Sequence, residues 1–97
     1  MEVRYTGTVA TTPFFFTSHR SHRTHEQFDV RADDGRTFRV VDNVTIAPRV
    51  PARPGDRVTV QGELIHAGGR PLVHWTHHDP GHRHADGFIA LGGRVYA

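Results

Sequence analysis

Hydrophobic and polar residues alternate with a period of two along several short segments of this 97-residue chain. Such alternation is typical of strands that bury one face, and no window shows the 3.6-residue period of an amphipathic helix. Five strands and a closing hairpin are therefore expected. The strands lie at residues 3–9, 27–31, 37–40, 57–64 and 70–76, and residues 88–91 and 94–96 form the hairpin.

Glycine-containing turn sequences separate several of these strands. Asp33-Asp34-Gly35 predicts a tight hairpin between the second and third strands. Three polar or proline-rich stretches lack the alternation and are expected to be loops, at residues 11–24, 43–54 and 77–87. In the fifth strand, His74 and Thr76 are expected on one face and Val73 and Trp75 on the core face. The side chains expected inside are Val9, Phe28, Val30, Phe38, Val40, Val58, Val60 and Trp75.

The length and strand order predict one small all-β domain. Ninety-seven residues are enough for a single domain. Five short strands with a long crossover after the third favour an OB-like barrel of five or six strands spanning residues 1–97. The pattern Gly-Asp-x-Val-x-Val-x-Gly at residues 55–62 is typical of entry into the fourth strand of such a barrel. An SH3-like barrel is the alternative with a similar number of strands.

Strand directions in an OB barrel predict which loops meet. The second strand begins, and the third and fifth strands end, at the same pole. His25, Asn43 and the segment after His74 should therefore face a common space, with Arg49 from the crossover nearby. Residues far apart in sequence would then form one site.

Composition excludes several classes of chemistry. The chain has no Cys and no Lys, which rules out thiolate ligands, thiol nucleophiles and Schiff-base lysines. Its net charge of +2 is too small to indicate nucleic-acid binding by itself. No transmembrane segment and no signal peptide are recognisable, so the expected location is cytoplasmic by default. No H-E-x-x-H, Walker or G-x-S-x-G motif occurs.

Histidine is the exception, with nine residues in the chain. Residues 74–86 hold five of them together with two Asp. Imidazole and carboxylate groups suit divalent transition metals, and Zn is the metal expected most. The alternative is a solvated polar loop, which is the interpretation given to His19 and His22. The candidate metal ligands are His25, His74, His77, His78 and His84.

Three further residues are candidates for a catalytic role. Arg49 could pair with an anionic substrate, and Asn43 is expected at the same pole. Asp79 precedes Pro80-Gly81, so its side chain either forms a turn or orients an imidazole.

Several motifs together resemble a known family. They are His25-x-Gln27-Phe28, Asn43-x-x-x-Ala47-Pro48-Arg49, Gly55-Asp56-x-Val58 and His74-Trp75-Thr76-His77-His78-Asp79-Pro80. The combination resembles an uncharacterised bacterial family of small domains of unknown function, over nearly the whole chain. Members typically have His directly before the Asn, where this chain has Asp42. The resemblance implies a β-barrel with one functional site, and it implies no particular activity.

Two functions remain open from the sequence, and a metal buffer or interaction protein without a substrate is a third. The first is a His-rich transition-metal site that hydrolyses a phosphodiester or a related anionic substrate. The alternative is a non-catalytic module that binds single-stranded nucleic acid or another anionic ligand. In that module the phosphate contacts would come from Arg4, Arg31, Arg39 and Arg57.

Overall fold

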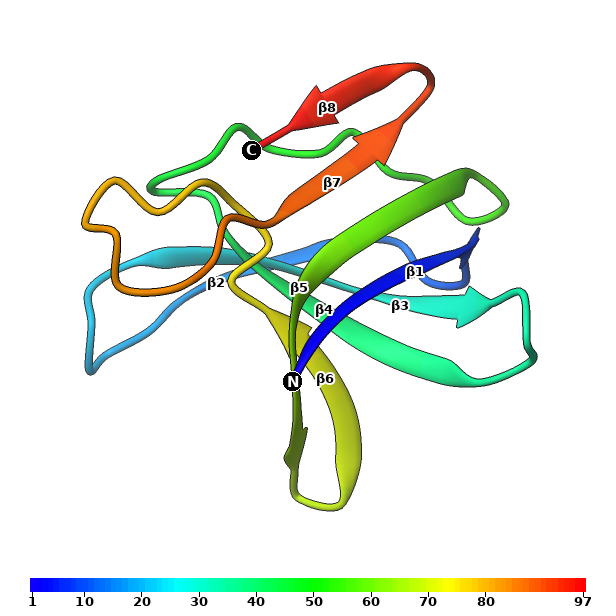
Figure 1. Cartoon of the computed structure of the whole chain (residues 1–97), viewed down its shortest axis with the longest axis horizontal. Helices are drawn as coiled ribbons and strands as arrows, with labels where there is room; N and C mark the ends of the chain where they lie inside the picture. Colours follow the sequence, from blue (N-terminus) through cyan, green and yellow to red (C-terminus); the bar gives the residue numbers. More distant parts are fainter.

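Eight strands and no helix make up the chain in a computed structural model that describes all 97 residues (Figure 1). No helix is long and apolar enough to cross a membrane. The strands are β1 (Glu2–Val9), β2 (Phe14–Thr17), β3 (Thr24–Ala32), β4 (Thr37–Asn43), β5 (Arg57–Ala67), β6 (Arg70–His74), β7 (Phe88–Leu91) and β8 (Arg94–Tyr96).

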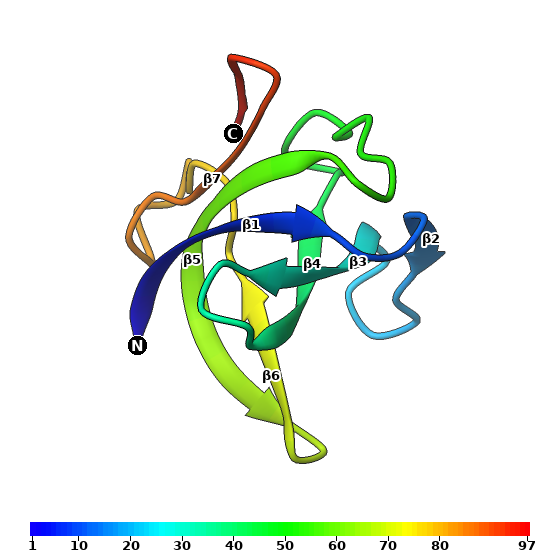
Figure 2. The same cartoon turned by 90° about the vertical axis from the view of Figure 1, so that its right-hand side faces the viewer.

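Five of these strands close into a barrel. The hydrogen-bonded order is β1-β3-β4-β6-β5, and β5 pairs again with β1 along seven residue pairs. β4 and β6 run parallel, and the other neighbours run antiparallel. Figure 2 shows the five strands wrapped around a common centre. The strand order and the crossover between β4 and β5 are those of an OB-like barrel, which confirms the predicted fold class.

The remaining strands extend the barrel. β7 pairs with β5 and β8 pairs with β7, which is the expected closing hairpin. β2 was not expected; it pairs with the first residues of β3. The apolar run of three Phe residues forms this strand, and Phe14 remains largely exposed. The crossover between β4 and β5 forms a turn at residues 44–46 and no helix.

Inward residues of the five barrel strands form the core. The seven Val and Phe residues predicted to lie inside are all buried, with exposures of 4% or less. The expectation for Trp75 was wrong, because its side chain is 43% exposed. β6 ends at His74, and Trp75 has a φ of 54°, which interrupts the alternation of faces. Thr76 therefore points into the protein and does not share the outward face of His74.

Candidate functional site

A cavity of about 210 Å³ lies where β3 begins and where β4 and β6 end. We call it the imidazole pocket. Its polar lining consists of His25, Asn43, His74, His77, Asp79 and His84. In Figure 1 the segments that supply these residues lie together on the left. The structure thus brings together three separate segments that the strand directions had placed at one pole.

The pocket opens on the outer face of the barrel wall. His25 on β3 is paired with Asn43 on β4, and both alternate in phase with outward-facing residues. His74 is the last residue of β6, on the other side of β4. The loop of residues 75–87 contributes the remaining polar side chains, so strand residues form one part of the lining and loop residues the other.

Two imidazole nitrogens in this pocket are buried without a hydrogen-bond partner. They are Nδ1 of His25 and Nε2 of His74. A buried polar atom that loses water without gaining a partner costs about 1–3 kcal/mol, so such atoms are rare in folded proteins. Each nitrogen therefore lacks a hydrogen-bond partner within the protein.

The same two side chains favour their neutral form. Burial lowers the pKa of His25, although the backbone oxygen of Arg23 offsets part of the shift. Burial also lowers the pKa of His74, and the nearby His84 and His77 add to this against the opposing charge of Glu63. Both imidazoles are thus neutral near pH 7 and have a lone pair to offer.

Two further imidazoles come from the loop. His77 Nδ1 lies 2.7 Å from the backbone oxygen of His78, and His84 Nδ1 lies 2.8 Å from that of Ala85. A carbonyl oxygen can only accept, so in both rings Nδ1 carries the proton. Nε2 is then the atom with the free lone pair, which is the arrangement found in many metal-binding and proton-accepting His residues.

Trp75 lies between two of the imidazoles. Its ring stacks on His74 at a centroid distance of 4.5 Å and on His84 at 4.6 Å, with nearly parallel planes. The indole therefore contacts both His74 and His84. His77 contacts the edge of His84 at 5.2 Å and lies near enough to His25 to lower its pKa. His77 is the loop imidazole best placed to act with the two strand imidazoles.

Asp79 organises the loop. Its Oδ1 accepts a hydrogen bond from the amide of Gly81, and its Oδ2 accepts from the amides of Arg83 and His84. Desolvation would raise the pKa of Asp79, but these three amides outweigh it and lower the pKa to about 2. Of the two roles considered from the sequence, the turn-forming one fits these contacts.

A pair of buried carboxyl groups supports the pocket from inside the barrel. Glu26 on β3 and Asp42 on β4 are register partners, and both are completely buried. Glu26 Oε1 accepts a hydrogen bond from the amide of Val50 in the crossover, and Asp42 Oδ1 accepts one from Thr76 Oγ1 in the loop. The pair therefore ties the crossover and the loop to the barrel wall.

Neither carboxyl group was identified from the sequence. The signal was present, because Glu26 is in phase with Phe28 and Val30, and Asp42 is in phase with Phe38 and Val40. Burial raises the pKa of Glu26. Burial also raises the pKa of Asp42 to about 7, and the neighbouring Glu26 contributes in the same direction.

Two predicted site residues lie outside the pocket. His78 is half-exposed, and its Nδ1 pairs with Asp86 Oδ1 at 2.9 Å. The side chains of these adjacent loop residues have different directions: His77 is buried and lines the pocket, whereas His78 does not line it. Arg49 lines a different cavity, where its guanidinium lies 4.7 Å above the ring of Phe15. Neither His78 nor Arg49 is thus part of the lining that contains His25.

The side chains of the imidazole pocket do not form a complete metal-binding site in this structure. No group of three or more His, Asp or Glu side chains is positioned to hold a metal ion. The types of donor nevertheless fit a transition metal, because two buried imidazole nitrogens are unpartnered and a third ring is fixed in the required tautomer.

The fold and the pocket define a class of protein, namely a small OB-like β-barrel with an imidazole-lined cavity on its outer wall. Residues 2–97 match a family described as protein of unknown function (DUF3465), and the chain belongs to this family. No curated protein and no solved structure matches the chain.

Proposed function

We propose that the imidazole pocket binds a divalent transition metal, most favourably Zn, and that His25, His74 and His77 are the ligands. The unpartnered nitrogens of His25 and His74 carry this proposal. A metal ion is a ligand that satisfies two lone pairs at once. A phosphate oxygen accepts a hydrogen bond only from the ring nitrogen that carries the proton, so the proposed metal requires His25 Nδ1 and His74 Nε2 to be the unprotonated nitrogens of their neutral rings.

The third ligand comes from the loop. His77 is buried, holds its proton on Nδ1 and has no hydrogen bond at Nε2. A rotation of this ring toward the two strand imidazoles completes a three-His set, which leaves one position of a tetrahedral ion open. Binding the ion thus draws the loop against the barrel wall.

The substrate class that fits such a site is a phosphodiester or a related anion. A bound divalent ion lowers the pKa of its water toward about 7 and polarises a phosphoryl oxygen. The protein contributes the position of the ion and the amide of Asn43 in the lining of the pocket. OB-like barrels bind nucleic-acid chains in many unrelated proteins, which supports this substrate class by analogy of fold.

The proposal is tested with protein purified without a His tag. Zn is titrated into the parent protein and into His25→Ala, His74→Ala and His19→Ala, with calorimetry and thermal unfolding as measurements. One ion per chain and a raised Tm are expected for the parent and for His19→Ala, because His19 is an exposed residue of another loop. Both effects should disappear in His25→Ala and His74→Ala.

Other results would contradict the proposal. Equal losses in all three variants would indicate diffuse chelation by surface histidines. A parent protein that shows no shift with Zn, Ni, Cu or Mn has no metal site. Oligonucleotide binding that a chelator leaves unchanged in such a protein would favour the non-catalytic binding module.

A further inference from the structure

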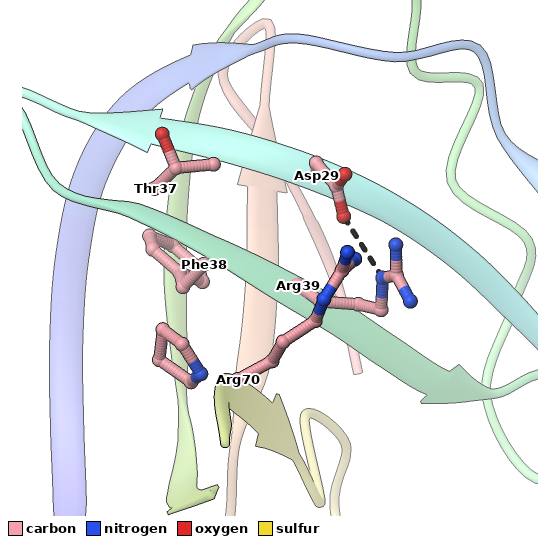
Figure 3. A pocket seen from close by; sticks show the side chains of 6 residues that line it. Asp29, Thr37, Phe38, Arg39 and Arg70 are labelled. Atoms are coloured by element: carbon pink, nitrogen blue, oxygen red, sulfur yellow. Dashed lines mark hydrogen bonds and ion pairs between the residues drawn. The ribbon is translucent and has the colours of Figure 1, made fainter. Parts of the chain in front are cut away.

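A second cavity of about 210 Å³ lies on the same side of the barrel, lined by Asp29, Arg39 and Arg70 among others (Figure 3). We propose that Arg39 and Arg70 bind phosphates of a single-stranded nucleic acid that lies along β3, β4 and β6 toward the imidazole pocket. This inference rests on the function proposed for that pocket, and it adds the surface that holds the substrate.

The two guanidinium groups have donors to spare. Arg39 uses Nε for a 3.0 Å hydrogen bond to Asp29 Oδ1, and its two terminal nitrogens have no partner. Arg70 makes no hydrogen bond and no ion pair. Figure 3 shows the Arg70 side chain reaching from β6 across β4 toward the Arg39–Asp29 pair. Two cations face one carboxylate, so the cavity has an excess of positive charge that suits a phosphate group.

Other arginines of the chain are already engaged. Arg57 pairs with Asp33, Arg36 pairs with Asp34, and Arg4 donates twice to Gln61. Of the four arginines that the sequence suggested for phosphate contacts, Arg4 and Arg57 are thus held by internal partners. Arg49 is the only arginine lining a third cavity and lies over Phe15, whereas the Arg39–Arg70 cavity brings two arginines with unpaired donors to one hollow.

The two cavities belong to one continuous face. On β4, Arg39 is four residues before Asn43, and outward side chains repeat every second residue. With a rise of about 3.3 Å per residue, about 13 Å separates the arginine cavity from the imidazole pocket. A single phosphate cannot occupy both cavities. A chain with a phosphate on every nucleotide can, and about 4–16 nucleotides are engaged by one OB barrel.

The width of the face indicates a single strand. Three adjacent strands span about 10 Å, which accommodates one phosphodiester backbone. Phe14 on β2 is the register partner of Gln27 on β3 and is 56% exposed, so one aromatic ring lies at the edge of this face and can stack on a base. Trp75 stacks on the imidazoles of His74 and His84. Phosphate contacts with sequence-tolerant stacking predict binding that depends strongly on salt and weakly on base sequence.

The test measures the Kd of a fluorescein-labelled 12-nucleotide oligo(dT) by anisotropy, at several salt concentrations and in the presence of EDTA. The double variant Arg39→Gln/Arg70→Gln is compared with Arg53→Gln/Arg94→Gln, which removes the same charge elsewhere on the surface. The first should raise the Kd about tenfold relative to the second. It should also reduce the slope of log K against log salt by about 1.4, since each contact with a single strand contributes about 0.7.

Asp29→Asn should change the Kd for the oligonucleotide in the opposite direction. It removes the carboxylate that competes for Arg39, so tighter oligonucleotide binding is expected. If the Arg39–Asp29 pair only stabilised the fold, Asp29→Asn would weaken binding along with the melting temperature. That result, or equal Kd values for the two double variants, would overturn the inference.

Zn titration of Arg39→Gln/Arg70→Gln separates this inference from the proposed function. The variant should bind Zn as the parent does, because neither arginine lines the imidazole pocket. If the variant binds Zn and its Kd for the oligonucleotide equals that of the parent, the phosphate site is overturned and the proposed function is not. Oligonucleotide binding through the arginines without any metal binding would overturn the proposed function alone.

Discussion

Thr76 Oγ1 donates a 2.9 Å hydrogen bond to Asp42 Oδ1 inside the barrel, and both side chains are completely buried. This contact joins the end of β4 to the loop that carries His77. His77 follows Thr76 directly and lines the imidazole pocket, so the buried hydrogen bond fixes the position of the first residues of the loop. The site on the outer wall thus depends on a polar contact in the interior.

Asp42→Asn is expected to stabilise the protein at high pH and to have little effect at pH 4. The pKa of Asp42 is raised from 3.8 to about 7, so the folded protein binds its proton more tightly than the unfolded chain. Stability from this group is full below about pH 4 and is lost as pH rises through 7. The amide of Asn carries no charge and still accepts from Thr76.

Thermal or urea unfolding of Asp42→Asn and of the parent at pH 4 and pH 8 measures this effect. The difference in unfolding free energy between the two proteins should grow by roughly 2–4 kcal/mol from pH 4 to pH 8. A difference that stays constant with pH would show that Asp42 titrates as it does in the unfolded chain.

Asp79→Asn should release the loop of residues 75–87. An amide group offers one acceptor oxygen where the carboxylate offers two, and its NH₂ would face the amides of Arg83 or His84. Faster proteolysis within the loop and faster amide hydrogen exchange at Arg83 and His84 are expected. Since the pKa of Asp79 is lowered to about 2, the parent loop should loosen only as pH falls from 4 toward 2. Unchanged exchange rates in the variant would assign no role to Asp79 in ordering the loop.

Gly87→Ala tests the path by which the loop returns to the barrel. A Cβ at Gly87 would lie 2.2 Å from the backbone oxygen of Trp75 and 2.6 Å from that of Gln61. Backbone atoms cannot move aside cheaply, so a loss of at least about 2 kcal/mol in unfolding free energy is expected.

Gly81→Ala is the matched control in the same loop. The nearest atom to its added Cβ is Asp79 Oδ1 at 3.4 Å, which is ordinary contact. Its unfolding free energy should stay within about 0.5 kcal/mol of the parent. If both glycine variants unfold alike, the close packing of Gly87 against Trp75 and Gln61 is incorrect.

Metal affinity should fall as pH drops below 6.5, the ordinary pKa of the His25 and His74 side chains. Protons compete with the ion for imidazole lone pairs. Because burial lowers the pKa of both His25 and His74 from 6.5, this competition begins at a lower pH than for exposed histidines. Zn affinity measured by competition with a chromophoric chelator should therefore be nearly constant between pH 7.5 and 6.5. A steady decline over that interval would indicate ligation by solvent-exposed imidazoles.

The barrel itself could be predicted from the sequence, because alternation along short segments determines both strands and inward faces. Val30 on β3 and Val40 on β4 were placed in the core by this pattern, and both are completely buried. The direction of successive strands then placed His25 and Asn43 at one pole. These predictions needed only period-two geometry and the order of the strands.

The details of the site could not be predicted in this way. The alternation breaks at Trp75, whose φ is positive although it is not a glycine and has no glycine neighbour in the sequence. As a result Trp75 is exposed and Thr76 is buried. Beyond this point the loop decides the direction of each side chain through its own hydrogen bonds. His77 and His78 are chemically identical neighbours, and only contacts such as that of His78 with Asp86 separate their roles.

Crystals of the tag-free protein soaked in Zn, measured at the Zn absorption edge, test the central claim most directly. The account predicts one strong anomalous peak per chain in the imidazole pocket, about 2.0–2.1 Å from both His25 Nδ1 and His74 Nε2. His77 should be turned toward the ion. A peak beside His78 or His19 with none in the pocket, or no peak at all, would contradict the account.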